Sequence, residues 1–230
     1  MIADLGLILA GAGAGSRFGS GRNKLLVDLC GRPVFLHSLA RFLQVVPAVQ
    51  ARVMAPAGLA GEFRAAMDAA RIGREVAVLE GGATRWESVL RGLRSLPEAV
   101  RFVAIQDAAR PLSSLELLLD CLASARARGS GVAARPVADT IKLVGPDGRV
   151  RQTPDRGSLR AAETPQVFAR EPLLEAYREV EASSVPVTDD AQALERRGLP
   201  VYLVEHRQYN PKITWPQDVA LVECYLESIS

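Results

Sequence analysis

The sequence has little of what most often carries catalysis or metal binding. It contains only two histidines and three cysteines in 230 residues. Cys30, Cys121 and Cys224 are odd in number, far apart and without the spacing of a zinc site, which excludes a disulfide framework and gives no metal centre. Such cysteine usage is typical of a reducing compartment, so we expect a cytoplasmic protein.

Long apolar runs and an excess of one charge are also missing. No stretch reaches about 18 apolar residues, and the first residues lack the basic flank of a signal peptide, so we expect neither a membrane span nor secretion. The 28 basic residues nearly balance 26 acidic ones, which argues against a nucleic-acid partner. The length and the 48% hydrophobic content predict one globular domain over residues 1–230.

Short apolar runs alternate with segments of helical spacing. Predicted strands cover residues 5–10, 49–55, 76–79, 100–105, 131–137 and 199–204. Predicted helices cover residues 33–43, 83–96, 115–128, 171–181, 188–197 and 215–229. Two of these helices are expected to begin with capping boxes, Ser113 with Glu116 and Thr214 with Gln217. The alternation predicts an α/β fold, a Rossmann-like, mostly parallel sheet with helices on both faces and ligands at the carboxyl ends of its strands.

Residues 140–159 interrupt the alternation. The turn Gly145-Pro146-Asp147-Gly148 separates two short extended runs, which predicts a β-hairpin that stands off the main sheet. A plain surface hairpin is the simpler interpretation. The alternative is a dimerisation arm over residues 138–162 that carries residues into a neighbouring subunit's site.

A glycine-rich loop from Gly11 to Gly19 directly follows the first predicted strand. Its small residues let the backbone approach a phosphate chain and direct several N–H groups at it. The loop lacks the third glycine of a dinucleotide fingerprint, and it lacks the Lys-Ser or Lys-Thr pair of a P-loop. Arg17 and Lys24 remain as two cations placed to meet a triphosphate, unless they are solvated side chains of an ordinary turn.

Further motifs follow in order along nearly the whole chain. They are Gly81-Gly82-Ala83-Thr84-Arg85 with Ser88, Asp107-Ala108-Ala109-Arg110-Pro111, residues 136–142 (PVADTIK), Asp155-Arg156, Thr164-Pro165-Gln166, Thr188-Asp189-Asp190-Ala191 and residues 210–214 (NPKIT). Together with the glycine loop they resemble the sugar-phosphate nucleotidyltransferases, and among these the 2-C-methyl-D-erythritol 4-phosphate cytidylyltransferase family of non-mevalonate isoprenoid biosynthesis. The resemblance implies transfer of a cytidylyl group from CTP to 2-C-methyl-D-erythritol 4-phosphate, giving 4-diphosphocytidyl-2-C-methyl-D-erythritol and pyrophosphate.

The resemblance also implies roles for individual residues. It implies catalytic roles for Arg17 and Lys24 and nucleotide binding by Gly11, Ala12, Gly13, Gly15, Gly82 and Ser88. It implies a sugar-phosphate site made by Asp107, Arg110, Thr140, Arg156, Thr164, Thr188 and Lys212. Thr140 and Arg156 would reach in from the partner subunit of a homodimer. The chain departs from the family pattern at Asn23 and Leu25, where proline and glutamine are common, and at Ala83, where an acid is common.

The chemistry of this reaction fits a chain with two histidines. A phosphomonoester carries about −1.5 to −2 charges at neutral pH, so its oxygen is already a nucleophile and needs no general base. The barrier is electrostatic, since negative charge grows on the triphosphate as pyrophosphate leaves. We expect Arg17 and Lys24 to stabilise that charge and Mg²⁺ to be held mainly by the CTP phosphates, with no metal site of the protein's own.

Three other functions stay open. A cytidylyltransferase for another alditol phosphate, such as ribitol 5-phosphate, would share the glycine loop and the Thr-Pro-Gln motif. A nicotinamide oxidoreductase would share the fold class but needs the missing fingerprint glycine. A non-catalytic nucleotide-binding protein would bind CTP and release no pyrophosphate.

Lysine is scarce, since only Lys24, Lys142 and Lys212 occur among the 28 basic residues. A compact ammonium fits between phosphate oxygens where a planar guanidinium is too large. We therefore expect phosphate roles for Lys24 and Lys212, whereas Lys142 lies on the predicted hairpin. A coding bias towards arginine is the alternative explanation.

Overall fold

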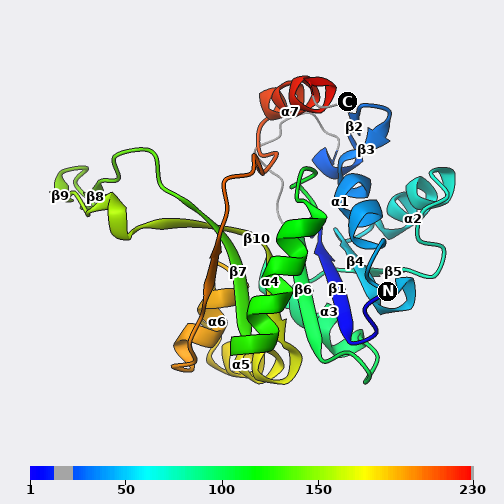
Figure 1. Cartoon of the computed structure of the whole chain (residues 1–230), viewed down its shortest axis with the longest axis horizontal. Helices are drawn as coiled ribbons and strands as arrows, with labels where there is room; N and C mark the ends of the chain where they lie inside the picture. The colour runs from blue at the N-terminus through cyan, green and yellow to red at the C-terminus, as the bar shows by residue number, and fades with distance from the viewer. Residues whose placement is uncertain (13–22, 229–230) are drawn as a thin grey trace.

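A seven-stranded sheet forms the centre of the computed structural model, which describes residues 1–12 and 23–228 (Figure 1). Its strands are β1 (Leu5–Ala10), β4 (Ala51–Ala55), β5 (Ala77–Glu80), β6 (Phe102–Asp107), β7 (Ser130–Pro136), β10 (Arg160–Ala169) and β11 (Leu203–Glu205). Their order across the sheet is β11-β7-β10-β6-β1-β4-β5. Among these strands, β10 alone runs antiparallel to its neighbours, β6 and β7. The predicted mostly parallel sheet is confirmed.

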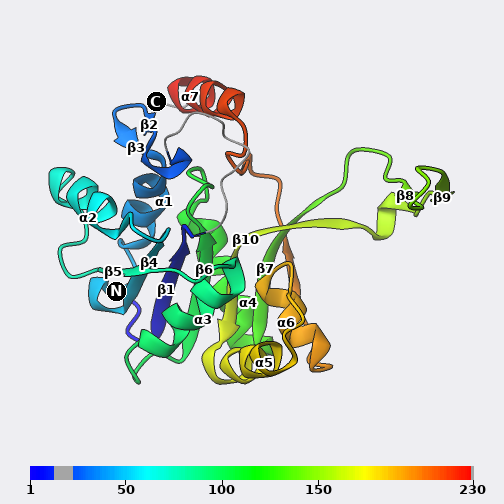
Figure 2. The same ribbon diagram turned by 180° about the vertical axis from the view of Figure 1, so that it is seen from behind.

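Helices cover both faces of the sheet, as predicted (Figures 1 and 2). They are α1 (Val34–Phe42), α2 (Ala60–Ala69), α3 (Arg85–Ser95), α4 (Leu115–Arg128), α5 (Arg170–Ser183), α6 (Asp190–Arg196) and α7 (Pro216–Ser228). Side chains alternate across a strand, so Leu7 and Leu9 of β1 enter one core with α1, α2 and α4. Ile8 enters the other core with α3, α5 and α6. This double burial explains why β1 is a continuous apolar run.

Two of the longer elements of the fold were not predicted. The helix α2 has only Phe63 and Met67 buried, so its apolar spacing in the sequence is weak. The long strand β10 was not recognised in the sequence because it contains Glu163 and Pro165. A charged residue breaks the apolar pattern, and proline inside a run argues against a strand. A register shift between Ala162 and Gln166 accommodates this part of the strand against β7.

The first residues of the helices differ from the predicted capping boxes. The N-cap of α4 is Ser114, whose side chain accepts a hydrogen bond from the backbone N–H of Leu117. The predicted capping residue, Ser113, is instead buried and turned towards the carboxyl edge of the sheet. At the start of α7 the backbone donates to Asp218 from Thr214 and Trp215. The capping box that the structure does show, Thr84 with Glu87 at α3, was not predicted.

The predicted hairpin is present and extends away from the rest of the molecule (Figures 1 and 2). It consists of β8 (Leu143–Val144) and β9 (Val150–Gln152). The N–H of Gly148 donates to the carbonyl of Gly145 at 3.0 Å, which closes the predicted turn. The strands β7 and β10 lead from the sheet to the hairpin and are paired as far out as Pro136 and Arg160. Over the described ranges, no helix is both long and apolar enough to cross a membrane.

Candidate active site

The carboxyl ends of four parallel strands place the predicted functional loops at one edge of the sheet. Ala10, the last residue of β1, lies opposite Met54 in β4 and Asp107 in β6. The loop after β5 also reaches β1, because a Cβ placed on Gly81 would lie 2.2 Å from that of Ala12. The two loops predicted to bind the nucleotide therefore touch, and residue 81 has to be glycine for that approach.

Gly82 and Ser88 lie within this pair of loops. The Ser88 hydroxyl is fully buried and accepts a hydrogen bond from the N–H of Gly82 at 2.9 Å. The same hydroxyl donates to the carbonyl of Thr84 at 2.8 Å. Ser88 thus holds the shape of the loop, and its direct contact with a base stays a prediction. Among the other predicted nucleotide and catalytic residues, Gly13, Gly15 and Arg17 lie outside the described residues.

Lys24 connects the first loop region to the C-terminal motif. It lies in the short 3₁₀ turn η1 (Lys24–Leu26), and its Nζ donates to the carbonyl of Ile213 at 2.7 Å. Ile213 is fully buried, and its N–H donates to the carbonyl of Ala109 in the loop after β6. The predicted catalytic lysine is therefore adjacent to the segment that carries Lys212.

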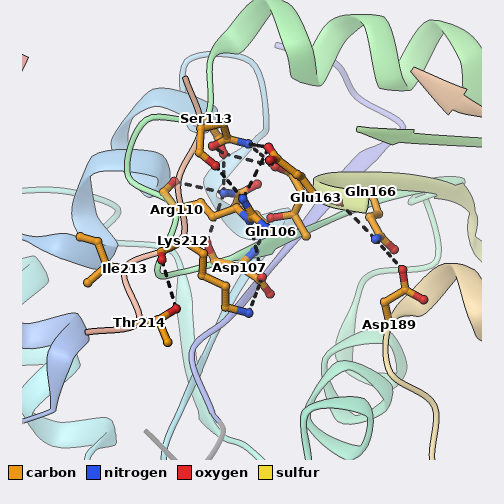
Figure 3. Close-up of polar contacts among 12 residues, drawn as sticks. Gln106, Asp107, Arg110, Ser113, Glu163, Gln166, Asp189, Lys212, Ile213 and Thr214 are labelled. Carbon is orange, nitrogen blue, oxygen red and sulfur yellow. Dashed lines mark hydrogen bonds and ion pairs between the residues drawn. The ribbon is translucent and has the colours of Figure 1, made fainter. Parts of the chain in front are cut away.

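A cavity of about 160 Å³ opens at the end of β6. It is lined by Arg85, Asp107, Arg110, Ala162, Glu163, Thr164, Gln166, Thr188, Asp189 and Lys212. Five of the seven predicted sugar-phosphate residues are in this lining: Asp107, Arg110, Thr164, Thr188 and Lys212. They come from segments far apart in the sequence, which the fold brings together; Figure 3 labels Asp107, Arg110 and Lys212 of this set.

Asp107 is the charged centre of the cavity. Its Oδ2 accepts from Lys212 Nζ at 2.7 Å and lies 3.8 Å from Arg110 Nε. Its Oδ1 accepts from Arg85 Nε at 3.1 Å. Burial alone would raise the pKa of the Asp107 carboxyl, but these three basic side chains hold the pKa well below its usual range. The carboxylate is therefore ionised, and it orients basic groups instead of exchanging protons near neutral pH.

Arg85 links the cavity to a second, fully buried carboxylate. Its Nη2 donates to Asp190 Oδ2 at 2.7 Å, and the other oxygen of Asp190 accepts from the Tyr177 hydroxyl. Burial would lower the pKa of Arg85, but Asp190 and Asp107 raise it well above its usual value. In Tyr177, burial and the neighbouring Asp190 both raise the pKa of the phenol. The tyrosine stays protonated and serves as a hydrogen-bond donor.

A polar scaffold behind the cavity fixes Arg110. The guanidinium donates from Nη1 to the carbonyl of Asn210 at 2.6 Å and lies 3.5 Å from Glu163 Oε2. The Asn210 amide donates to Glu163 and to the carbonyl of Thr164, both at 2.9 Å. Thr164 is buried, and its hydroxyl accepts from the N–H of Asp107 at 3.0 Å. This network, drawn in Figure 3, ties β10 and the C-terminal motif to the end of β6.

Thr140 and Arg156 are not in the cavity of the same chain. Both are exposed and lie on the arm, beyond the end of the central sheet. Arg156 donates from Nη1 to the carbonyl of Ala138 at 3.0 Å within the arm. A role at a partner's site stays a prediction for both residues.

Arg85, Glu163, Gln166 and Asp189 line the cavity and were not predicted as site residues. Three of them belong to motifs that the sequence shows, so their position beside predicted residues was an available signal. Glu163 gave only a weak one. It precedes the Thr164-Pro165-Gln166 motif, in a strand that the sequence pattern did not reveal.

The assembled loops and cavity have counterparts in known proteins. The model of the family described as 2-C-methyl-D-erythritol 4-phosphate cytidylyltransferase matches residues 5–228. The chain belongs to this family. A family member from Synechococcus elongatus is 41% identical over 221 residues, covering 96% of this chain and 95% of that protein. Another, from Symbiobacterium thermophilum, is 40% identical over 224 residues, covering 96% and 92%.

Solved structures agree with this membership in a cytidylyltransferase family. The 2-C-methyl-D-erythritol 4-phosphate cytidylyltransferase from Thermus thermophilus is 30% identical, with a TM-score of 0.80 and coverage of 99% of this chain and 100% of that one. The 4-diphosphocytidyl-2C-methyl-D-erythritol synthase from Anaerococcus prevotii is 25% identical, with a TM-score of 0.85 and coverage of 97% and 98%. The α/β fold and the nucleotidyltransferase class predicted from the sequence are confirmed.

Proposed function

We propose that this chain transfers a cytidylyl group from CTP to 2-C-methyl-D-erythritol 4-phosphate, releasing pyrophosphate. The observation that carries the proposal is the family match over residues 5–228. It is supported by the cavity beside two touching glycine loops, which gathers five residues of the implied sugar-phosphate site. The free cysteines fit a reducing compartment such as the cytoplasm.

In this proposal the glycine loops bind CTP and the cavity binds the sugar phosphate. Gly11, Ala12 and Gly82 let the nucleotide approach the backbone, while Lys24 lies next to the C-terminal motif that carries Lys212. The phosphate oxygen of the sugar attacks the α-phosphorus of CTP, and the bond to pyrophosphate breaks. Arg17 and Lys24 stabilise the negative charge that grows in this step, since fixed cations in a preorganised site need no reorganisation.

The sugar phosphate would meet a site whose charges are already arranged. Lys212 and Arg110 converge on Asp107, and in this proposal that carboxylate holds their charged groups in place while other N–H donors of the same groups meet phosphate oxygens. An ammonium and a guanidinium recognise phosphate differently, the first as a point charge and the second as a planar fork.

Magnesium would enter with CTP and supply charge neutralisation on the triphosphate. The described residues fit that mode, because Asp107, the carboxylate at the end of β6, is already paired with three basic side chains. Nor do the ranges 1–12 and 23–228 gather any three His, Cys, Asp or Glu side chains in a metal-binding group. The ion would therefore take most of its ligands from phosphate and water.

The arm would make a homodimer and complete the partner's site. Its exposed apolar side chains, Leu143, Val144 and Val150, form a surface on the hairpin that a second copy can cover. Thr140 and Arg156 lie at the two sides of the arm, and in a dimer they would reach the neighbouring sugar phosphate. The proposal therefore predicts that activity depends on assembly.

The test is a coupled pyrophosphate assay with the purified chain, CTP and 2-C-methyl-D-erythritol 4-phosphate, with and without EDTA. We expect pyrophosphate release that needs both substrates and stops with EDTA. Ribitol 5-phosphate and the other nucleoside triphosphates are the matched alternatives. Faster turnover of ribitol 5-phosphate would contradict the assigned sugar, and CTP binding without pyrophosphate release would contradict catalysis.

A further inference from the structure

Arg85 joins three elements through one guanidinium. It is the first residue of α3 and contacts Asp107 at the end of β6 and Asp190 at the start of α6. Its side chain is 24% exposed, while that of Asp190 is 0% exposed. Tyr177 of α5 donates to the second oxygen of Asp190. The start of α6, which follows the cavity residues Thr188 and Asp189, is thereby tied to the end of β6.

The two carboxylates that contact Arg85, Asp190 in the buried half of this arrangement and Asp107 at the cavity, depend on it to different degrees. A fully buried carboxylate needs a partner, because leaving its charge uncompensated is strongly destabilising. Arg85 meets that requirement for Asp190. Asp107 does not need Arg85 for neutralisation, since it also faces Lys212 and Arg110.

What Arg85 does for Asp107 is select its orientation. It occupies Oδ1, and the donors of Lys212 and Arg110 both face Oδ2. Without the guanidinium the carboxylate can rotate, and Lys212 loses the fixed oxygen to which it donates. The position of the Lys212 ammonium at the cavity then becomes variable.

We propose that Arg85 is a positioning residue for cytidylyl transfer: by holding Oδ1 of Asp107 it aims Oδ2 at Lys212 and so fixes the ammonium that meets the sugar phosphate. The inference rests on the proposed function, because it assumes that Lys212 binds that phosphate. It adds a residue that acts through Asp107 and Lys212 and that sequence patterns had shown only as part of a motif.

Two variants separate positioning from folding. Arg85→Gln removes the charge from both carboxylates. The double variant Arg85→Gln/Asp190→Asn restores a neutral match in the buried half, since the asparagine amide can donate to the glutamine while its oxygen still accepts from Tyr177. Asp107 remains without the guanidinium in both variants. Arg94→Gln is the control on the same helix, because Arg94 forms an exposed pair with Glu181 far from the cavity.

The measurements are thermal unfolding and kcat/KM for each substrate, with the other one saturating. We expect Arg85→Gln to lower the melting temperature and the double variant to recover most of that loss. In the double variant kcat/KM for the sugar phosphate should stay roughly 10- to 100-fold below wild type, a typical cost of misplacing a binding group. Its kcat/KM for CTP should change less than about threefold. A loss of folded enzyme would lower kcat/KM for both substrates equally, so it cannot produce this selective effect.

Two results would contradict the inference, and they are distinguishable. If the wild-type chain releases no pyrophosphate from CTP and 2-C-methyl-D-erythritol 4-phosphate, the proposed function fails and the inference fails with it. If the wild type is active and the double variant regains full kcat/KM for the sugar phosphate, Arg85 serves only to neutralise Asp190. If kcat/KM of the double variant falls equally for both substrates, Arg85 likewise has no selective role at the sugar-phosphate site. Arg94→Gln should match wild type throughout.

Discussion

At the scale of single residues, the cavity is defined by pairs of opposite charge. Asp107, Glu163 and Asp189 face Arg85, Arg110 and Lys212 around one small volume. A phosphate that enters therefore meets a Lys212 ammonium that already donates to a carboxylate, instead of an unpaired cation. The positions of the charged atoms in the cavity, more than its net charge, therefore determine how it meets a phosphate.

Replacing Lys24 tests the catalytic role at the first loop. Lys24→Ala should lower kcat on the order of 10²–10³-fold, because removing one preorganised charge from a transition-state site typically has that effect. The steady-state rate of pyrophosphate release measures it. Lys142→Ala is the matched control, since the Lys142 ammonium donates to Thr153 on the exposed arm. Near wild-type turnover in Lys24→Ala would exclude the assigned role.

The depressed pKa of Asp107 predicts how the stability of the protein depends on pH. Burial would raise this pKa, but the basic neighbours lower it below the ordinary value of 3.8. A carboxyl with a lower pKa in the folded state contributes stability that is complete above its unfolded pKa and is lost as the pH falls towards the folded one. Asp107→Asn should therefore be less stable than wild type at pH 6, and the difference should shrink steadily below about pH 4.

Urea unfolding of both proteins at pH 6, 4 and 3 measures this difference. Glu181→Gln serves as the control, because Glu181 pairs with Arg94 on the surface and should contribute little at any pH. A difference between wild type and Asp107→Asn that stays constant from pH 6 to pH 3 would show that the ion pairs of Asp107 do not stabilise the fold.

At the scale of helices and strands, close backbone contacts decide which residues are tolerated. The strand β7 packs against α4 through Gly131, where an added Cβ would lie 2.1 Å from the carbonyl oxygen of Cys121. That oxygen belongs to the backbone of α4, so it cannot move aside as the end of a flexible side chain can. The separation of α4 from the sheet is therefore set by the absence of a side chain at position 131.

Gly131→Ala should destabilise the protein by about 1–3 kcal/mol, the usual cost of overpacking. Gly61→Ala is the matched control, because Gly61 lies in α2 and an added Cβ meets nothing within 4 Å. The control should be stabilising by up to about 1 kcal/mol through helix propensity. Thermal or urea unfolding of the two variants checks both signs, and a neutral Gly131→Ala would mean that α4 can shift without cost.

The sequence predicted elements well where burial produced a regular pattern. The range of β1 was predicted without error, because the strand is buried on both faces and forms a continuous apolar run, and six of the helices were found from their helical spacing. The strand β10 was missed, since buried Glu163 and Pro165 break the apolar pattern. Glu163 is placed there by contacts with Arg110, Asn210 and the cavity that only the tertiary structure provides.

The candidate site was predicted to the extent that motifs could be carried over. Asp107, Arg110, Thr164, Thr188 and Lys212 converge on one cavity, although they are spread over more than a hundred positions of the sequence. The motif marked the position of Arg85 but not its partners, which are two carboxylates that lie 22 and 105 positions away. Ser88 proved to shape a loop, which its residue type alone does not indicate.

At the scale of the whole molecule, the arm is the part whose apolar side chains the single chain leaves exposed. Val144 is 61% exposed at its tip, and its neighbours on the hairpin have no core of their own. A hairpin of this size is not stable in isolation. We expect contact with a second copy to cover it.

Val144→Asp should shift the protein from dimer to monomer, because it would bury a charge in an apolar contact. Analytical ultracentrifugation over a range of concentrations measures the shift. Pyrophosphate release should fall with it and recover partly as the protein concentration rises. Val185→Asp is the matched control, since Val185 is also an exposed valine, at 51%, but lies between α5 and α6. A Val144→Asp protein that sediments like wild type would contradict dimerisation through the arm.

The pairing of Pro136 with Arg160 also makes the arm an insertion in the topological sense. The two residues lie opposite each other at the point where β7 and β10 leave the sheet, so the chain departs and returns at the same place. A two-residue Asn-Gly turn spans such a gap between antiparallel strands. The arm could thus be excised and replaced by a tight turn without rethreading the sheet, which makes the remaining α/β unit a natural scaffold for a monomeric nucleotide-binding domain.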